Sequence, residues 1–338
     1  MSRDAVTRAD VARLAGVSPA VVSYVVNGSP RPVSSNARSR VEEAIRQLGY
    51  RPNAVARALR TGMTRTVGLV VPNVGNPFFA DLSRRVQHLC ADAGYSLLLV
   101  DSEGDAEREA GQIMNLVDRQ IDGLIVASGS AHGVREDLMR SIGVPCVVLD
   151  RVRPVPGVVT VGVDFESASA LAVSHLLQHG HDRIAAILGD DGSDSTRARE
   201  RGWAAAIGSF GAVEGRTIRA PYTRDGGYRA GLSLLRHVDR PSAVFVSSDL
   251  QAVGLLRAAH AVGVRVPDDL AVVAFDGSAE CAYTSPPLSV VEQPVDAIAE
   301  AAVRAITEAA RGADHTVFRA SLRVRGSCGC VSAEPEET

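Results

Sequence analysis

Polar side chains that directly follow apolar, strand-like runs are the residues of this sequence best suited to chemistry. In open parallel sheets ligands bind beyond the carboxyl ends of the strands, where such residues gather. Carboxylates, amides and hydroxyls suit the vicinal hydroxyls of a sugar, which donate and accept hydrogen bonds together. Each residue alone can instead cap the helix that follows, as Asp249 is well placed to do. The candidates are Asn73, Asn76, Asp101, Ser128, Asp150-Arg151, Asp190, Ser247-Ser248-Asp249 and Asp276.

Catalytic motifs are absent from the sequence. The segment after the first strand reads Pro72-Asn-Val-Gly75-Asn-Pro77, which does not fit the G-x-G-x-x-G of a dinucleotide site. Neither a G-x-S-x-G nucleophile elbow nor a P-loop is present. We therefore expect no enzyme activity and no cofactor.

The cysteines and histidines predict no metal site. Cys328 and Cys330 form a C-x-C pair, but we find no partner ligands at a suitable spacing and interpret the pair as incidental. His179 and His181 flank a glycine without a carboxylate partner. The other cysteines are isolated, as is typical of reduced thiols: Cys90, Cys146 and Cys281.

Strand and helix patterns alternate from Thr66 onward. Helical patterns such as Phe79–Ala93 and Leu250–Ala261 separate most of the strands, which predicts a doubly wound α/β arrangement with parallel sheets. The pattern restarts near Asp164, so we expect two similar lobes. The expected strands are Val67–Val71, Ser96–Val100, Gly123–Ala127, Cys146–Leu149, Val158–Val163, Ile184–Leu188, Ala243–Val246 and Leu270–Phe275.

Residues 8–27 carry two short helical patterns around a tight turn, which predicts a helix-turn-helix. Gly16 breaks the first pattern, Ser18 is a good N-cap and Pro19 a good first helical residue. The second helix would enter the major groove of DNA, with its N-terminus at a phosphate. A third helix is expected from about Ser34 to Leu48, ended by Gly49. The second helix would expose Pro19, Ala20, Ser23 and Tyr24.

The distribution of charge supports a nucleic-acid partner for this N-terminal part. Residues 1–65 hold 11 arginines and 4 acidic residues, a net charge of +7, whereas the remainder carries −10 and the whole chain −3. A basic head on an acidic body suggests that the head meets a polyanion. The longest apolar runs are strand-length and the N-terminus has no apolar stretch, so we expect a cytoplasmic protein that does not enter a membrane.

A short segment after the head forms a further element. Asn53 can cap a helix that runs through Leu59. Such a helix is too short to be stable alone and would need DNA or a partner chain to order it.

Two sets of motifs resemble the LacI/GalR family of bacterial repressors. In the head they are Asp10-Val-Ala…Ala-Gly-Val-Ser18…Val-Asn27 and Leu48-Gly-Tyr-Arg-Pro-Asn53-x-x-Ala56-x-x-Leu59. In the body they include Val71-Pro-Asn-x-x-Asn76-Pro-Phe-Phe79, Arg199-x-x-Gly202-Trp203 and Ala274-Phe-Asp276, so the resemblance covers nearly the whole chain. It implies a dimeric transcription regulator, bound to a near-palindromic DNA operator and controlled by a small-molecule effector.

The resemblance also implies residue roles. Arg199 and Asp276 match the positions that hold the effector in the family, and Leu59 matches a leucine that wedges between base steps in the minor groove. Ser248 stands where several sugar-binding members have asparagine. The expected effector contacts are Asn73, Asn76, Phe78, Ser128, Asp150, Arg199, Tyr222, Ser248, Asp276 and Gln293. The expected DNA contacts are Thr7, Arg8, Ser18, Pro19, Ala20, Val21, Ser23, Tyr24, Asn27, Ser34, Asn53, Ala56 and Leu59.

The predicted organisation is a helix-turn-helix head at 1–51, a hinge helix at 52–61, a two-lobed effector-binding and dimerisation domain at 62–330 and a disordered tail at 331–338. A sugar is the favoured effector, and a nucleobase or another small metabolite stays open. We favour release of DNA on effector binding, as in catabolic sugar repressors of the family. The tail has no heptad repeat, which favours a dimer over a tetramer. A solute-binding transport protein would share the two lobes but predicts a signal peptide and no head.

Overall fold

The computed structural model describes residues 6–28, 31–128, 136–190, 192–211, 214–308 and 314–330. The chain divides into two compact units, Met1–Thr64 and Arg65–Thr338, and each is described by itself. The predicted tail at 331–338 lies outside the described residues.

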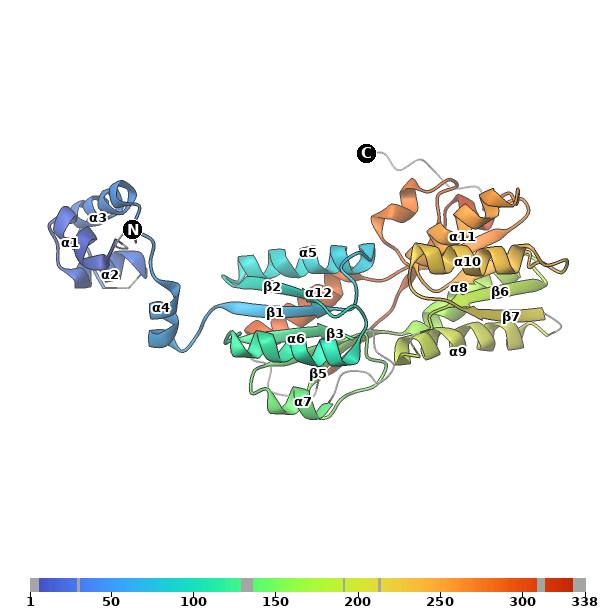
Figure 1. Ribbon diagram of the computed structural model, residues 1–338, viewed down its shortest axis with the longest axis horizontal. Coiled ribbons are helices and arrows are strands. Elements are labelled where there is room, and N and C mark those ends of the chain that lie inside the picture. The colour runs from blue at the N-terminus through green and yellow to red at the C-terminus, as the bar shows by residue number, and fades with distance from the viewer. Residues whose placement is uncertain are drawn as a thin grey trace. The chain divides into compact units, whose positions relative to one another are not determined.

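The described residues of the first unit form four helices, α1 (Arg8–Ala15), α2 (Pro19–Val26), α3 (Ser35–Leu48) and α4 (Ala54–Thr61) (Figure 1). Thr7 and Asp10 form a reciprocal capping box at the start of α1. Gly16 ends α1 with a φ of 62°, a left-handed conformation that glycine adopts without strain. Ser18 caps α2 by accepting a hydrogen bond from the Val21 amide. The bend between α1 and α2 is 105°, so the predicted helix-turn-helix is present.

A small apolar core fixes this arrangement. Its buried residues come from α1, α2 and α3, and they are Val11, Ala12, Ala15, Val22, Val41 and Ala44. Across the described part of the chain, no single helix is long and apolar enough to cross a membrane; only α1 and α2, taken as a bent pair, pass a test of length and composition.

The second unit contains two six-stranded sheets, which form two lobes (Figure 1). The first sheet has the order β11-β5-β4-β3-β1-β2 and the second β12-β10-β9-β8-β6-β7. The strands of the first sheet are β1 (Thr66–Val71), β2 (Ser96–Asp101), β3 (Gly123–Ala127), β4 (Cys146–Leu149), β5 (Val159–Val163) and β11 (His315–Phe318). Those of the second are β6 (Arg183–Leu188), β7 (Glu214–Arg219), β8 (Ala243–Val246), β9 (Ala271–Asp276), β10 (Ser289–Glu292) and β12 (Ser321–Arg323).

Helices cover the sheets of this unit. They are α5 (Pro77–Asp92), α6 (Ala106–Asp118), α7 (Glu136–Ser141), α8 (Phe165–Gln178), α9 (Asp194–Ser209), α10 (Arg224–Leu235), α11 (Asp249–Ala261) and α12 (Val295–Thr307), with short 3₁₀ turns η1 (Ala279–Tyr283) and η2 (Gly326–Cys328). The largest buried core spans both sheets and their helices, with Phe165, Phe245 and Phe275 among its largest side chains.

The chain passes between the lobes after β5, after β10 and after β11. The predicted restart near Asp164 is confirmed, because α8 begins the second lobe there. However, α12 returns to the first lobe and lies beside α5, although more than 200 residues separate the two helices in sequence (Figure 1).

The expected strands are present within about one residue of their predicted ends. Four further strands were not predicted: β7, β10, β11 and β12. β7, β11 and β12 are sheet-edge strands with exposed or half-exposed side chains, so they lack the continuous apolar run of a buried strand. The expectation of wholly parallel sheets is wrong at one edge, where β12 runs antiparallel to β10.

Candidate functional site

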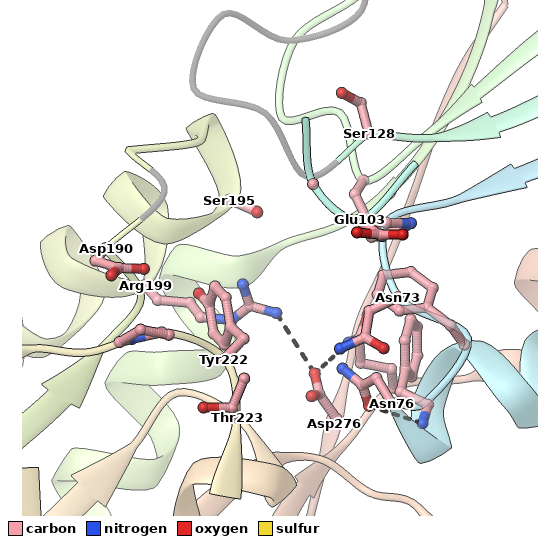
Figure 2. Close-up of a pocket in the computed structure, with 17 residues that line it drawn as sticks. Asn73, Asn76, Glu103, Ser128, Asp190, Ser195, Arg199, Tyr222, Thr223 and Asp276 are labelled. Carbon is pink, nitrogen blue, oxygen red and sulfur yellow. Dashed lines mark hydrogen bonds and ion pairs between the residues drawn. The ribbon is translucent and has the colours of Figure 1, made fainter. Parts of the chain in front are cut away.

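A cavity of about 320 Å³ lies between the two lobes of the second unit, beyond the carboxyl ends of several strands (Figure 2). All predicted effector contacts except Ser248 line it. The first lobe contributes Asn73, Asn76, Phe78, Ser128 and Asp150, and the second contributes Arg199, Tyr222 and Asp276, with Gln293 at the crossing after β10. The structure therefore brings together residues that are up to 220 positions apart in sequence.

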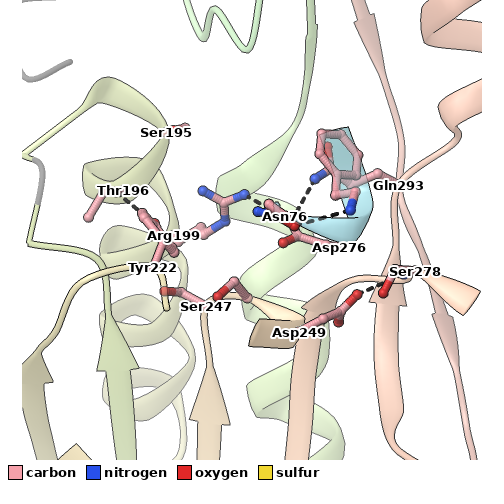
Figure 3. Close-up of polar contacts among 12 residues, drawn as sticks. Asn76, Ser195, Thr196, Arg199, Tyr222, Ser247, Asp249, Asp276, Ser278 and Gln293 are labelled. Atoms are coloured by element: carbon pink, nitrogen blue, oxygen red, sulfur yellow. Dashed lines mark hydrogen bonds and ion pairs between the residues drawn. The ribbon is translucent and has the colours of Figure 1, made fainter. Parts of the chain in front are cut away.

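Arg199 and Asp276 form an ion pair in the part of the cavity wall that the second lobe provides. Arg199 Nη2 is 3.5 Å from Asp276 Oδ1, and both side chains are buried. The guanidinium carbon lies 4.5 Å from the ring centroids of both Phe165 and Phe275, which hold it by cation–π contacts. Gln293 Nε2 donates to Asp276 Oδ1 at 2.9 Å and orients the carboxylate (Figure 3).

Burial raises the pKa of Asp276 well above its ordinary value, and the Arg199 guanidinium opposes this change. Asp276 also has a φ of 108°, an unusual conformation for a residue with a side chain. Backbone strain of this kind is often found at ligand sites, where surrounding contacts maintain it. The surrounding contacts here are the ion pair with Arg199 and the bond from Gln293.

Asn73 and Asn76 shape the wall of the first lobe, in the loop between β1 and α5. Asn73 Oδ1 accepts a 2.8 Å hydrogen bond from the Gly75 amide, and Asn76 Oδ1 caps α5 through the Phe78 amide at 3.1 Å. Both side-chain oxygens therefore accept hydrogen bonds from backbone amides nearby in the chain. The two side chains still face the cavity (Figure 2). The two roles that the sequence left as alternatives, cap and cavity wall, coincide at Asn76.

Asp150 and Ser128 complete this wall at the ends of β4 and β3. Burial raises the pKa of Asp150 to about 6, while the positive charge of Arg199 lowers it. Ser128 Oγ donates to Glu109 Oε1 at 3.2 Å. Burial raises the pKa of Glu109 to about 7, and the bond from Ser128 opposes that rise.

Tyr222 forms the opposite side of the cavity. Its hydroxyl shares a 2.8 Å hydrogen bond with Thr196 Oγ1 at the start of α9 (Figure 3). The ring packs on Gly189, where an added Cβ would come within 2.3 Å of a ring carbon. Gly189 is therefore required for the position of Tyr222.

Ser248 does not line the cavity. It is buried and caps α11, because its Oγ accepts from the Gln251 amide at 3.3 Å and donates to Gln251 Oε1 at 3.2 Å. The neighbouring Asp249 accepts a 2.7 Å bond from the Ser278 amide, and burial raises its pKa to about 6. This carboxylate holds the loop that follows Asp276, the last residue of β9.

Several lining residues were absent from the predicted contact set: Pro72, Phe79, Glu103, Gly104, Asp190, Ser195, Pro221 and Thr223. Asp190 belongs to the polar residues that the sequence places after a strand, but not to the predicted effector contacts. Asp101, another such residue, instead holds the neighbouring loops, accepting bonds from the Val74 amide at 2.9 Å and the Glu103 amide at 2.7 Å. The positive φ of 51° at Glu103, followed by Gly104, turns this loop toward the cavity. The glycine at 104 is the sequence feature that could have indicated this turn.

The first unit carries a groove of about 520 Å³ formed by the start of α1, one side of α2 and the segment that leads into α4. Of the predicted DNA contacts, it includes Thr7, Arg8, Ser23, Asn27, Asn53 and Ala56. Pro19 and Ala20 are exposed at the start of α2, and Tyr24 accepts a 3.0 Å bond from Arg31. Ser18 and Ser34 cap α2 and α3.

The segment predicted as a hinge helix is helical as α4. Asn53 Oδ1 accepts from the Ala56 amide at 3.2 Å, which is the predicted cap. Leu59 is 84% exposed, so within this unit it has no packing role that would account for a leucine.

Comparisons with known proteins agree with both units. A model of the lacI family of bacterial regulatory proteins matches residues 7–53, and a model of a periplasmic binding protein-like domain matches residues 173–328. The ribose operon repressor of Escherichia coli (strain K12) is 36% identical over 301 residues, which are 88% of this chain and 91% of that protein.

Two solved structures extend the comparison. The transcriptional regulator CelR in complex with cellobiose has a TM-score of 0.69 and 30% identity, covering 95% of this chain and 99% of its own. The lac repressor dimer bound to operator and the anti-inducer ONPF has a TM-score of 0.84, covering 96% and 99% of the two chains. At 24% identity this last likeness concerns the fold.

Proposed function

The chain belongs to the lacI family of bacterial regulatory proteins, and we propose that it is a transcription repressor whose interlobe cavity binds a sugar. Its head is a DNA-binding helix-turn-helix and its second unit an effector-binding domain. That head distinguishes it from solute-binding transport proteins, which share only the two lobes. A repressor acts at the chromosome, so the cytoplasm is its proposed location, and we assign it no catalytic reaction.

The observation that carries the sugar assignment is the polar chemistry of the cavity. Asp150, Asp276 and Arg199 meet there with the amides Asn73 and Asn76. Carboxylates accept from hydroxyls, and a guanidinium donates to them in a fixed fork geometry, so the set matches vicinal diols. Two similar proteins also support a sugar as effector: one is a ribose operon repressor, and the structure of another was solved in complex with cellobiose.

A nucleobase is the second candidate, favoured by the aromatic part of the wall. Phe78, Phe79 and Tyr222 line the same cavity, and the Phe78 and Phe79 rings meet edge to face with centroids 5.1 Å apart. A flat heterocycle can stack on such a surface. The same regulator would then sense a nucleobase.

A homodimer would explain the exposed edge of the first sheet. β2 is the edge strand, with Leu98 and Leu99 36% and 43% exposed. Edge strands that expose apolar side chains are prone to pair with another chain. In a two-fold dimer, two α2 helices would enter successive major grooves of a near-palindromic operator, and paired α4 helices would enter the central minor groove.

The switch follows from the cavity's place between the lobes. A ligand that contacts both lobes favours one lobe closure over another, and that closure would change how the two α4 helices approach each other. We propose that a bound sugar releases the operator.

A thermal-shift screen of sugars and nucleobases on the purified chain, with its own upstream DNA titrated in parallel, tests this function. A ligand that binds only the folded state raises the melting temperature. A sugar that stabilises the chain and weakens DNA binding supports the proposal. A nucleobase hit transfers the assignment to the second candidate, and loss of all DNA binding in the absence of ligand contradicts release.

A further inference from the structure

Three potential metal ligands meet at the C-terminal end of α8, away from the interlobe cavity. Cys330 Sγ lies 3.2 Å from His179 Nε2 and 3.6 Å from His175 Nε2. The ligand atoms of the three residues all lie within 4.8 Å of one another. The imidazole ring centroids are 4.7 Å apart. Sequence spacing could not reveal this group, because 155 residues separate His175 from Cys330.

The two sulfur–nitrogen distances in this group are close to those of a tetrahedral zinc site. With Zn–S about 2.3 Å, Zn–N about 2.0–2.1 Å and a tetrahedral angle, sulfur and nitrogen ligands lie about 3.6 Å apart. Both sulfur–nitrogen distances in the cluster are within about 0.4 Å of that value. Small side-chain movements would therefore be enough to bind an ion.

The helix supplies two further features of a site. His175 and His179 are four residues apart on α8 and its C-cap, so both rings project from one face. The carbonyl end of a helix carries partial negative charge, which favours a cation there. The turn η2 then brings Cys330 against this end, and Cys328 lies beside it but hydrogen-bonds with Ser289 at 3.1 Å.

We propose that His175, His179 and Cys330 bind a divalent transition metal of the zinc class, with a fourth position open to water. Imidazole and thiolate are the ligands that zinc prefers. His179 is exposed and the other two residues are half-buried, so solvent can reach the ion. The site would fasten the segment after η2 to α8. It corrects the interpretation of Cys330 as a residue without partner ligands.

Cobalt titration of the full-length chain tests the proposal, because Co²⁺ replaces zinc and reports its ligands by colour. Any polyhistidine tag must be removed, since it binds the same metals, and a phosphine must keep the thiols reduced. We expect about one equivalent of Co²⁺ to give a thiolate charge-transfer band and tetrahedral visible bands, both removed by one equivalent of Zn²⁺. Absence of these bands would overturn the proposal.

Variants locate the ligands. His179→Gln is decisive because the side chain is exposed and its loss leaves the fold intact, and Cys330→Ser removes the sulfur. Each should weaken Co²⁺ binding at least tenfold, and Cys330→Ser should also remove the charge-transfer band. The matched controls Cys328→Ser and His181→Gln should keep both the Co²⁺ affinity and the charge-transfer band of the parent chain. A charge-transfer band that persists in Cys330→Ser, or one that disappears in Cys328→Ser, would refute this ligand set.

Discussion

Arg199 Nη2 lies 3.5 Å from Asp276 Oδ1, in a pair whose side chains are only 9% and 6% exposed. Charge-assisted bonds of this kind are usually about 2.7–2.9 Å long, so the pair is stretched. Both residues line the cavity, one from α9 and the other from the end of β9. A hydroxyl placed beside them can donate to the carboxylate and accept from the guanidinium.

Replacing Arg199 by alanine should abolish the response to the effector and leave operator binding in the absence of effector intact. It removes the donor of the pair and leaves Asp276 buried without its charge partner, a change that typically costs about 3–5 kcal/mol of stability. Calorimetry measures effector affinity, and fluorescence anisotropy measures DNA binding. Arg201→Ala is the matched control, because Arg201 lies on α9 like Arg199 but forms an exposed ion pair with Glu166 of α8. An effector response that survives in Arg199→Ala would show that the effector binds elsewhere.

Gly189→Ala should weaken effector binding by about tenfold or more while DNA binding persists. The new methyl group would lie within 2.3 Å of the Tyr222 ring and push it from its place against Thr196. Gly208→Ala, on α9, adds the same methyl group where no atom lies within 4 Å and should leave effector affinity unchanged. Equal effector affinities in calorimetry for the two variants would contradict a role for Tyr222.

The cavity could largely be predicted from the sequence because its residues follow strands, and strand ends in a parallel sheet converge at one edge. Ser248 satisfies the same rule but turns its hydroxyl to Gln251. A serine that follows a strand can either cap the next helix or contact a ligand, and the sequence pattern is the same in both cases. Only the three-dimensional structure distinguishes the two roles.

Contacts between distant segments could not be predicted in this way. The return of α12 to the first lobe, the edge strands β11 and β12, and the cluster around Cys330 all depend on where the chain crosses between lobes. Local patterns of hydrophobicity carry no information about those crossings. The edge strands also have mixed exposure, so their own periodicity is weak.

Stability should depend on pH through Asp150. Because burial raises its pKa from 3.8 to about 6, the folded chain holds this proton more tightly than the unfolded chain. The resulting stabilisation is complete below about pH 3.8 and is lost as the pH rises through about 6. Asp150→Asn should therefore gain stability relative to the parent chain between pH 4 and pH 7, measured by denaturant unfolding.

Asp269 provides the control for this pH effect. Its hydrogen bonds with Arg265 lower its pKa to about 2, so its contribution is present above about pH 3.8 and is lost only as the pH falls toward 2. The stability difference between Asp269→Asn and the parent should stay constant from pH 4 to pH 7. A constant difference for Asp150→Asn as well would show that Asp150 titrates normally in the folded chain.

Leu59→Ala should weaken operator binding by at least tenfold at physiological salt without changing the melting temperature of the second unit. Leu59 is 84% exposed, so truncation removes no core contact, and any loss must come from contacts with DNA or a partner chain. An apolar side chain that unstacks a base step stabilises the bent operator through the wider contact that bending allows. Leu14→Ala is the matched control, because Leu14 is also exposed in the head but lies outside the predicted DNA contacts. Because the wedge carries no charge, the slope of affinity against salt concentration should be the same for Leu59→Ala and the parent. A shallower slope, with the loss of affinity greatest at low salt, would instead assign the effect to lost phosphate contacts.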